Sequence, residues 1–196
     1  MKPLTLLLTT IFLFSSPLVW GEEVRYDDLV YRDGLWYKKF SEDVFSGTVC
    51  CEYMGITHRG KVINGKREGK WTFWNSDGRL LLRQIYKNGK LDGLSEWYRH
   101  DGGQLYKRKN YKNGKEDGLE ELYHNDGRVD RRITYKNGNR HGRYEEYWGN
   151  GQLLEKGYYK NGEKDGFWET YDQKGQEWSI KHYKNGKKDG VEEEFY

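Results

Sequence analysis

An Asn-Gly pair recurs along this chain at a nearly constant interval, and this recurrence limits the possible folds more than any other feature. Six of the seven Asn-Gly pairs form a series with intervals of 24, 25, 24, 24 and 24 residues. The series consists of Asn64-Gly65, Asn88-Gly89, Asn113-Gly114, Asn137-Gly138, Asn161-Gly162 and Asn185-Gly186, and Asn150-Gly151 lies outside it. A second glycine follows four residues after each of these glycines. A fixed period of this length is typical of repeat proteins, in which each unit is one small supersecondary motif.

Each unit contains two short runs of residues between glycine-marked turns. Asn-Gly favours a two-residue hairpin turn, because both residues tolerate a positive φ. Runs of about six residues match the usual length of a strand. The chain contains no alanine, the strongest helix former. The sequence therefore predicts an all-β fold: an elongated array of stacked antiparallel β-hairpins, with about six regular 24-residue units and one degenerate N-terminal unit.

The expected core is thin and built from aromatic rings. Phe, Trp and Tyr make up 16% of the chain and the formal net charge is only +3. Disordered chains normally combine few aromatic residues with a high net charge, so this chain is expected to fold. Rings recur at the fifth position after the second glycine of each unit: Trp74, Tyr98, Tyr123, Tyr147, Tyr171 and Phe195. We expect equivalent residues of successive units to stack, so that these rings form a ladder.

A glutamate recurs at the third position after the second glycine. The row consists of Glu96, Glu121, Glu145, Glu169 and Glu193. Because like charges placed side by side repel, we expect this row to be exposed and balanced by the lysines that precede the Asn-Gly pairs. These lysines are Lys87, Lys112, Lys136, Lys160 and Lys184. We interpret both rows as solvated faces or, alternatively, as a charged recognition stripe.

A second group of rings is expected on the opposite side of the sheet from the ring ladder. These rings are Trp71, Phe73, Trp97, Tyr144 and Trp168. Together with the glutamate row they are the candidate partner-binding residues, since exposed rings can stack on sugars or cations. The interpretation that the sequence favours is that they form the second half of the thin core, because glutamates occupy several equivalent positions.

The first 21 residues resemble a secretory signal peptide. Lys2 precedes an apolar run over residues 4–14, and cleavage is predicted after Gly21. We therefore expect a secreted or periplasmic protein. The rest of the chain is divided into a degenerate N-terminal capping repeat, residues 22–61, and a repeat domain, residues 62–196, since terminal repeats are usually atypical.

The side chains that most often carry chemistry give no catalytic or metal pattern. Cys50 and Cys51 are adjacent, and side chains of adjacent strand residues point to opposite faces, so we do not expect them to bond to each other. They are interpreted as two small residues, one buried and one not, or as part of an intermolecular disulfide. The histidines fall at different phases of the repeat and are expected at the surface: His58, His100, His124, His141 and His182. No metal site, cofactor or enzymatic activity is expected.

The unit Tyr-Lys-Asn-Gly-Lys-x-Asp-Gly resembles the bacterial variant of the MORN repeat, the form found in the YwqK-type antitoxin-component family. The resemblance covers residues 62–196 strongly and residues 26–61 weakly. It implies hairpins stacked into an elongated, curved antiparallel sheet with a binding or scaffolding role.

These observations predict a secreted or periplasmic protein-interaction scaffold whose protein partner is unknown. The alternatives are an antitoxin-like inhibitor of a toxin and an aromatic-face binder of envelope glycan or lipid. Nearly balanced charge argues against nucleic acid, which requires a clustered basic face. A membrane surface is considered but not favoured, and the terminal strand could accept a second copy of the chain.

Overall fold

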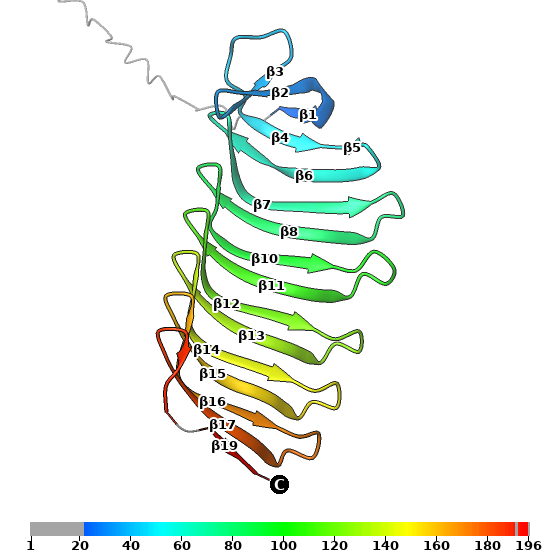
Figure 1. Cartoon of the computed structure of the whole chain (residues 1–196). Helices are drawn as coiled ribbons and strands as arrows, with labels where there is room; N and C mark the ends of the chain where they lie inside the picture. Colours follow the sequence, from blue (N-terminus) through cyan, green and yellow to red (C-terminus); the bar gives the residue numbers. More distant parts are fainter. Residues whose placement is uncertain (1–21, 191, 196) are drawn as a thin grey trace, which may run out of the picture.

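The computed structural model describes residues 22–190 and 192–195, and within them nearly all regular structure is β-strand. A short 3-10 turn, η1, occupies Tyr26–Asp28. The strands build a long sheet of stacked hairpins (Figure 1), which confirms the predicted all-β array. The predicted signal peptide, residues 1–21, lies outside the described residues.

One sheet runs the length of the molecule, and every neighbouring pair of strands in it is antiparallel except β1 with β4. Its strands are β1 (Glu23–Arg25), β4 (Gly47–Cys50), β5 (Glu52–Tyr53), β6 (Ile56–Ile63), β7 (Lys66–Asn75), β8 (Leu80–Lys87), β9 (Lys90–Leu91), β10 (Gly93–Tyr98), β11 (Leu105–Lys112), β12 (Lys115–Tyr123), β13 (Val129–Lys136), β14 (Asn139–Tyr147), β15 (Leu153–Lys160), β16 (Glu163–Tyr171), β17 (Glu177–Lys184), β18 (Lys187–Lys188) and β19 (Glu193–Glu194). A separate hairpin of β2 (Leu29–Arg32) and β3 (Leu35–Lys38) lies at the N-terminal end.

The two edges of the sheet carry different kinds of turn. The six periodic Asn-Gly pairs lie at one edge, on the left in Figure 1, and the φ of every asparagine in them lies between 48° and 53°. This is the geometry of the predicted hairpin turn, whose two central residues both need a positive φ. The other edge carries longer turns such as residues 75–79, where the Asn75 side chain accepts hydrogen bonds from the N–H groups of Asp77 and Arg79.

Hydrogen bonds join each Asn-Gly turn to the unit before it. The Gly89 N–H donates to the Arg67 carbonyl at 2.9 Å, and the same bond recurs in the following units. The Asn113 N–H donates to the Asp92 carboxylate at 3.0 Å. Glu68, Asp117 and His141 accept from the equivalent asparagines. The acidic residue of the repeat therefore satisfies a turn N–H of the next unit.

The N-terminal segment imitates this arrangement with different residues. The Asn64 N–H donates to Ser46 Oγ at 2.8 Å, and the Gly65 N–H donates to the Phe45 carbonyl at 2.8 Å. Ser46 and Gly47 thus take the place of the Asp-Gly pair in a regular unit. The repeated turn geometry is continued toward the N-terminus without the repeat's own sequence.

Four of the hairpins closed by an Asn-Gly turn contain a bend where the pairing register shifts. These shifts lie between Arg59 and Lys61, Lys109 and Tyr111, Ile133 and Tyr135, and Lys156 and Tyr158. Such β-bulges bend the strand and increase its twist. Beyond the bend, the Arg67 guanidinium lies 4.4 Å from the centre of the Trp71 ring and donates to the Tyr86 hydroxyl. Arg140 donates to the Tyr159 hydroxyl in the same way.

One face of the sheet carries the core, and we call it the ring face. It consists of the second and fourth positions after the second glycine, because alternate residues of a strand share a face, together with the residues opposite them. Trp71 and Trp168 are only 1% and 2% exposed. Each indole lies against a strand glycine, Gly60 or Gly157, where a Cβ atom would overlap the ring. Each indole N–H also donates to a backbone carbonyl.

The ring-face core is divided into two apolar clusters. The first contains Leu29, Phe45, Val49, Val62 and Trp71, and the second contains Ile133, Tyr144, Tyr159 and Trp168. Between them lie the buried polar side chains of Ser95, Lys109 and Glu120. The Lys109 ammonium lies 2.5 Å from a Glu120 oxygen and 2.6 Å from a Glu116 oxygen. A buried ion pair thus interrupts the apolar core near the middle of the array.

The two cysteines form a disulfide with each other, so the prediction that they would not was wrong. That prediction assumed an uninterrupted strand. Cys51 instead lies between β4 and β5 with a φ of 80°. Strand alternation therefore does not apply to it, and the two side chains can meet.

The prediction that all five histidines lie at the surface was wrong for His58, which is 9% exposed. Its ring stacks on Tyr26 at 4.8 Å between centroids and meets Phe73 edge-on. Burial lowers the pKa of His58, since it disfavours the charged imidazolium. The N-terminal segment supplies Tyr26, a contact that the repeat pattern does not contain.

Candidate functional site

The face opposite the rings carries an alternating row of charges, and we call it the ladder face. Across the sheet the row runs Arg83, Glu96, Arg108, Glu121, Arg132, Glu145, Lys156 and Glu169, each residue being the cross-strand neighbour of the next. We call this row the charged ladder. Opposite charges directly across an antiparallel pair stabilise it, so the ladder joins successive units.

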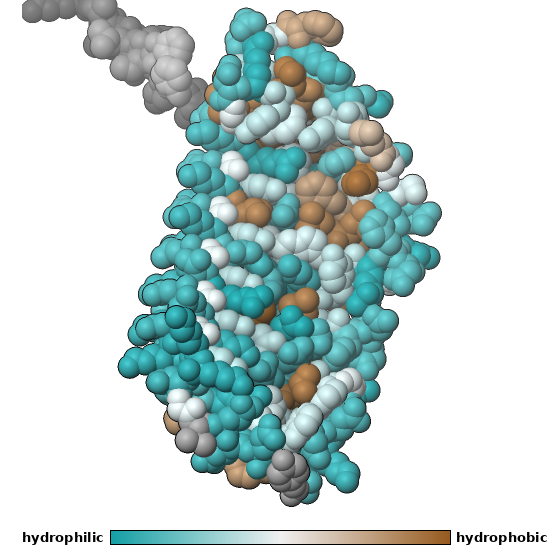
Figure 2. Space-filling view, in the orientation of Figure 1, coloured by the Kyte–Doolittle hydropathy of each residue, from teal (hydrophilic) through white to brown (hydrophobic). Residues whose placement is uncertain are grey.

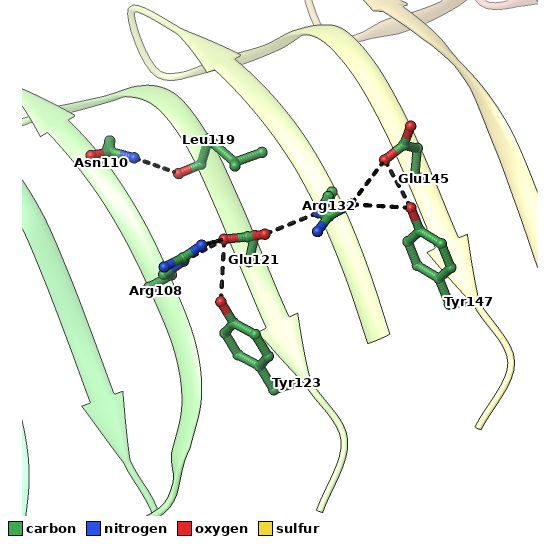
Figure 3. A network of polar contacts seen from close by, with 8 residues as sticks. All are labelled: Arg108, Asn110, Leu119, Glu121, Tyr123, Arg132, Glu145 and Tyr147. Carbon is green, nitrogen blue, oxygen red and sulfur yellow. Dashed lines mark hydrogen bonds and ion pairs between the residues drawn. The ribbon is translucent and has the colours of Figure 1, made fainter. Parts of the chain in front are cut away.

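Glu121 is the most enclosed member of the charged ladder, at 2% exposed (Figure 3). Its carboxylate accepts a hydrogen bond from Arg132 at 2.9 Å and is also bonded to Arg108. The Tyr123 hydroxyl donates to it at 3.2 Å. Burial disfavours the charged carboxylate, but the hydrogen bonds from Arg132 and Arg108 outweigh burial and lower the pKa of Glu121. Glu121 is therefore ionised and fully paired at neutral pH.

The tyrosines at the fifth position after the second glycine hydrogen-bond to the glutamates and do not stack on one another. The Tyr147 hydroxyl donates to Glu145 at 3.0 Å (Figure 3), and Tyr171 bonds to Glu169. Within residues 22–190 and 192–195, no two of the six rings predicted to stack lie in ring contact. Cations lie over four of them instead, at 5.3 to 5.9 Å from the ring centres. The predicted ring ladder was therefore wrong.

The return strand of each unit explains why the rings do not stack. It also explains why the glutamates do not repel one another. Equivalent residues of successive units are separated by a return strand, so they lie two strand spacings, or about 10 Å, apart. An Arg or Lys lies between neighbouring glutamates, and the repulsion expected within the row does not arise. The partners are Arg83, Arg108, Arg132 and Lys156, and the prediction that Lys87, Lys112, Lys136, Lys160 and Lys184 balance the row was wrong.

The candidate partner-binding residues do not share one surface. Glu96, Glu121, Glu145 and Glu169 lie in the charged ladder, and Glu193 continues their row in β19, beside Ile180. The rings lie on the opposite, ring face. Trp71, Tyr144 and Trp168 are buried, while Phe73 and Trp97 are half-buried. The interpretation of these rings as core fits their burial, and a binding surface made of all five is not available.

The ladder face also exposes a line of apolar side chains beside the charged ladder. Ile85, Leu119, Tyr158 and Phe167 are 40%, 37%, 43% and 64% exposed. They occupy the first position after the second glycine or the position paired with it. A face that alternates exposed apolar residues with paired charges is suited to contact with another protein.

The edge with the Asn-Gly turns carries a series of lysines, which we call the lysine edge. It consists of Lys66, Lys87, Lys90, Lys112, Lys115, Lys136, Lys160, Lys184 and Lys187, all exposed. Figure 2 shows this edge as a hydrophilic margin down the left side of the molecule. In the described part of the chain, none of these nine ammonium groups lies within ion-pair distance of a carboxylate.

Neither a metal site nor a membrane-spanning helix is found in the described residues. No group of three or more His, Cys, Asp or Glu side chains there could hold a metal ion. None of the helical structure in that part is long and apolar enough to cross a membrane.

Sequence reasoning missed the basic half of the charged ladder, although the signal was present. Arg83, Arg108, Arg132 and Lys156 each lie five residues before an Asn-Gly pair. The register between strands was needed to show that they lie between the glutamates. The sequence shows a lysine on each side of most of these turns, but the lysines before the turns were wrongly expected to pair with the glutamates.

Comparison with protein families identifies part of the array. The family model described as "MORN repeat variant" matches residues 116–137 and 140–161. These segments run from β12 into the turn after β13, and from β14 into the turn after β15. No curated protein matches the chain.

Proposed function

We propose that this MORN-type repeat array is a non-catalytic protein-interaction scaffold, secreted or periplasmic, that binds its partner through the ladder face. MORN repeats are often found in interaction proteins, which supports a binding role. The observation that carries the proposal is the line of exposed apolar residues along the charged ladder, which reaches 64% exposure at Phe167. An extended repeat surface suits a large partner, because each unit contributes one contact position.

The proposed secretion depends on residues 1–21. If they are a signal peptide, the mature protein begins at Glu22. N-terminal sequencing of the protein recovered from a host envelope or medium tests this. An intact N-terminal Met in protein retained inside the cell would contradict secretion without affecting the binding proposal.

The YwqK-type resemblance narrows the same proposal to one kind of partner. An antitoxin-like protein would bind a toxin, and the ladder face would be the surface that covers it. A glycan or lipid binder that used the five candidate rings receives no support, since Trp71, Tyr144 and Trp168 are buried.

Binding through the ladder face is tested by a surface substitution with a matched control. Phe167→Glu should weaken saturable capture of the partner from envelope extract by more than about tenfold, because it places a charge in the apolar line. Phe40→Glu makes the same chemical change at a fully exposed loop position away from the sheet and should leave capture unchanged. Equal capture by both variants would overturn the proposed surface.

A further inference from the structure

We propose that the lysine edge binds a linear acidic polysaccharide, a function separate from protein binding on the ladder face. The fold leaves one set of positive charges without carboxylate partners. The cations of the charged ladder are paired with glutamates, whereas the nine lysines of the lysine edge have no carboxylate partner in the described residues. An anion can bind to these unpaired surface cations without breaking an existing ion pair.

The hairpin stack arranges these charges in a regular series along one edge of the sheet. Successive Asn-Gly turns are two strands apart, or about 10 Å, because neighbouring strands are about 4.8 Å apart. Inter-unit hydrogen bonds fix this interval, such as the 2.8 Å bond from the Gly138 N–H to the Glu116 carbonyl. A linear polymer with regularly spaced anionic groups can therefore contact one turn after another, with a gain in affinity from each unit.

A groove runs beside the richest part of the lysine edge. It has a volume of about 870 Å³, and Lys90, Lys112, Lys115 and Lys136 contribute to its lining. Tyr158 and Thr134 line it as well. Asp117 is the acidic residue of this lining, and its carboxylate accepts the Asn137 N–H. The groove thus combines four free cations with hydroxyl groups and a partly exposed ring.

These groups fit an acidic sugar chain better than a nucleic acid. The cations that directly flank the Asn-Gly turns are all lysines, which act as point charges, whereas arginine is the side chain that binds phosphate in a bidentate manner. The arginines of β8, β11 and β13 that face the ladder are already engaged by glutamates. Sugar hydroxyl groups can hydrogen-bond to the Thr134 and Tyr158 side chains, and a sugar ring can pack on Tyr158.

The test measures binding of the purified protein to dextran sulfate, with neutral dextran of the same length as the reference polymer. We expect binding to dextran sulfate alone, weakening as salt is raised. Affinity should rise with polymer length until the polymer spans the six turns, about 50 Å. Binding of both polymers alike, or no binding of either, would overturn the proposal.

Two variants with the same change in net charge locate the site. Replacing Lys90, Lys112, Lys115 and Lys136 by Gln should weaken binding more than about tenfold, because four contacts are lost. Replacing Lys39, Lys61, Lys70 and Lys174, which are exposed elsewhere, by Gln should change it less than about twofold. Circular dichroism establishes that both variants are folded. Equal losses would show attraction to overall charge and would overturn the assignment.

Two further probes decide the class of ligand. A single-stranded oligothymidylate bound more tightly than dextran sulfate, with the same dependence on the four lysines, would overturn the polysaccharide assignment. Binding only to vesicles that contain an anionic phospholipid would do so too. Phe167→Glu should leave dextran sulfate binding within about twofold of the original, which separates this function from partner binding on the ladder face.

Discussion

At the scale of single residues, the charged ladder depends on one enclosed carboxylate. Glu121 is 2% exposed and its partners Arg108 and Arg132 expose about two-fifths of their side chains. A buried charge is tolerated only when it is paired and hydrogen-bonded. Glu121 meets that condition through two guanidinium groups and the Tyr123 hydroxyl.

Glu121→Gln should therefore destabilise the protein by about 1–3 kcal/mol, because both arginines lose their charged partner while solvent screens part of the loss. Urea denaturation measures the free energy of unfolding. Glu193→Gln is the matched control, since Glu193 occupies the same row but is exposed beside Ile180, and should cost less than about 0.5 kcal/mol. A similar cost for both variants would contradict the role of Glu121.

The lowered pKa values of the ladder carboxylates predict how acid affects the stability of the protein. Burial opposes ionisation of Glu121 and Glu169, but hydrogen bonds from cations outweigh burial and lower both pKa values below the usual range for glutamate. A lowered folded-state pKa gives stability that is complete above the unfolded value and is lost as pH falls through the folded value. The melting temperature should fall below about pH 4.3, and Glu121→Gln should flatten that fall. An unchanged slope in the variant would refute this linkage.

At the scale of the strands, two glycines make room for the core tryptophans. Gly60 and Gly157 lie in extended strand, β6 and β15, and each lies under an indole of the next strand, Trp71 or Trp168. These glycines are needed because they leave space for the indole rings, and not because they adopt a special backbone conformation. The indole can then lie flat against the backbone and donate its N–H to a carbonyl.

Gly157→Ala should destabilise the protein by about 1–3 kcal/mol, because the new methyl group overlaps the Trp168 ring and forces the core apart. The tryptophan emission should shift as the indole moves. Gly149→Ala is the control, since a Cβ there meets nothing within 4 Å. Equal stability of the two alanine variants would show that the indole does not need the glycine.

At the scale of the whole molecule, a polar interruption divides the core. The apolar cluster near β4–β7 and the one over β13–β16 are separated by Ser95, Lys109 and Glu120. Burial lowers the pKa of Lys109, because it disfavours the charged ammonium more than the contact with Glu116 favours it. Continuity of the array across this region is provided by backbone hydrogen bonds and the charged ladder.

Replacing Lys109 by Met together with Glu120 by Leu should give a free energy of unfolding about 1–4 kcal/mol higher than that of Glu120→Leu alone, since the double variant leaves no unpaired lysine in the core. Glu120→Leu alone should lower the free energy of unfolding of the original protein, because Lys109 then loses its nearest partner. Chemical denaturation of the three proteins gives both values. A double variant less stable than the single one would contradict this account of the core.

The sequence by itself determined the architecture of this protein. The interval between Asn-Gly pairs predicted the hairpin array, the positive φ of asparagines such as Asn113 and the placement of Trp71 and Glu121 on opposite faces. These properties are local, because turn chemistry and strand alternation act over a few residues.

Only the tertiary structure decided which side chains are neighbours. A return strand separates equivalent residues, so Arg132 lies between Glu121 and Glu145 where a repeat alignment suggests contact between glutamates. The positive φ of Cys51 permits a disulfide that strand alternation excludes. The lysine edge stays unpaired for the same reason: strand register assigns the glutamates to other cations. Contacts across strands depend on register, which the period of a sequence does not contain.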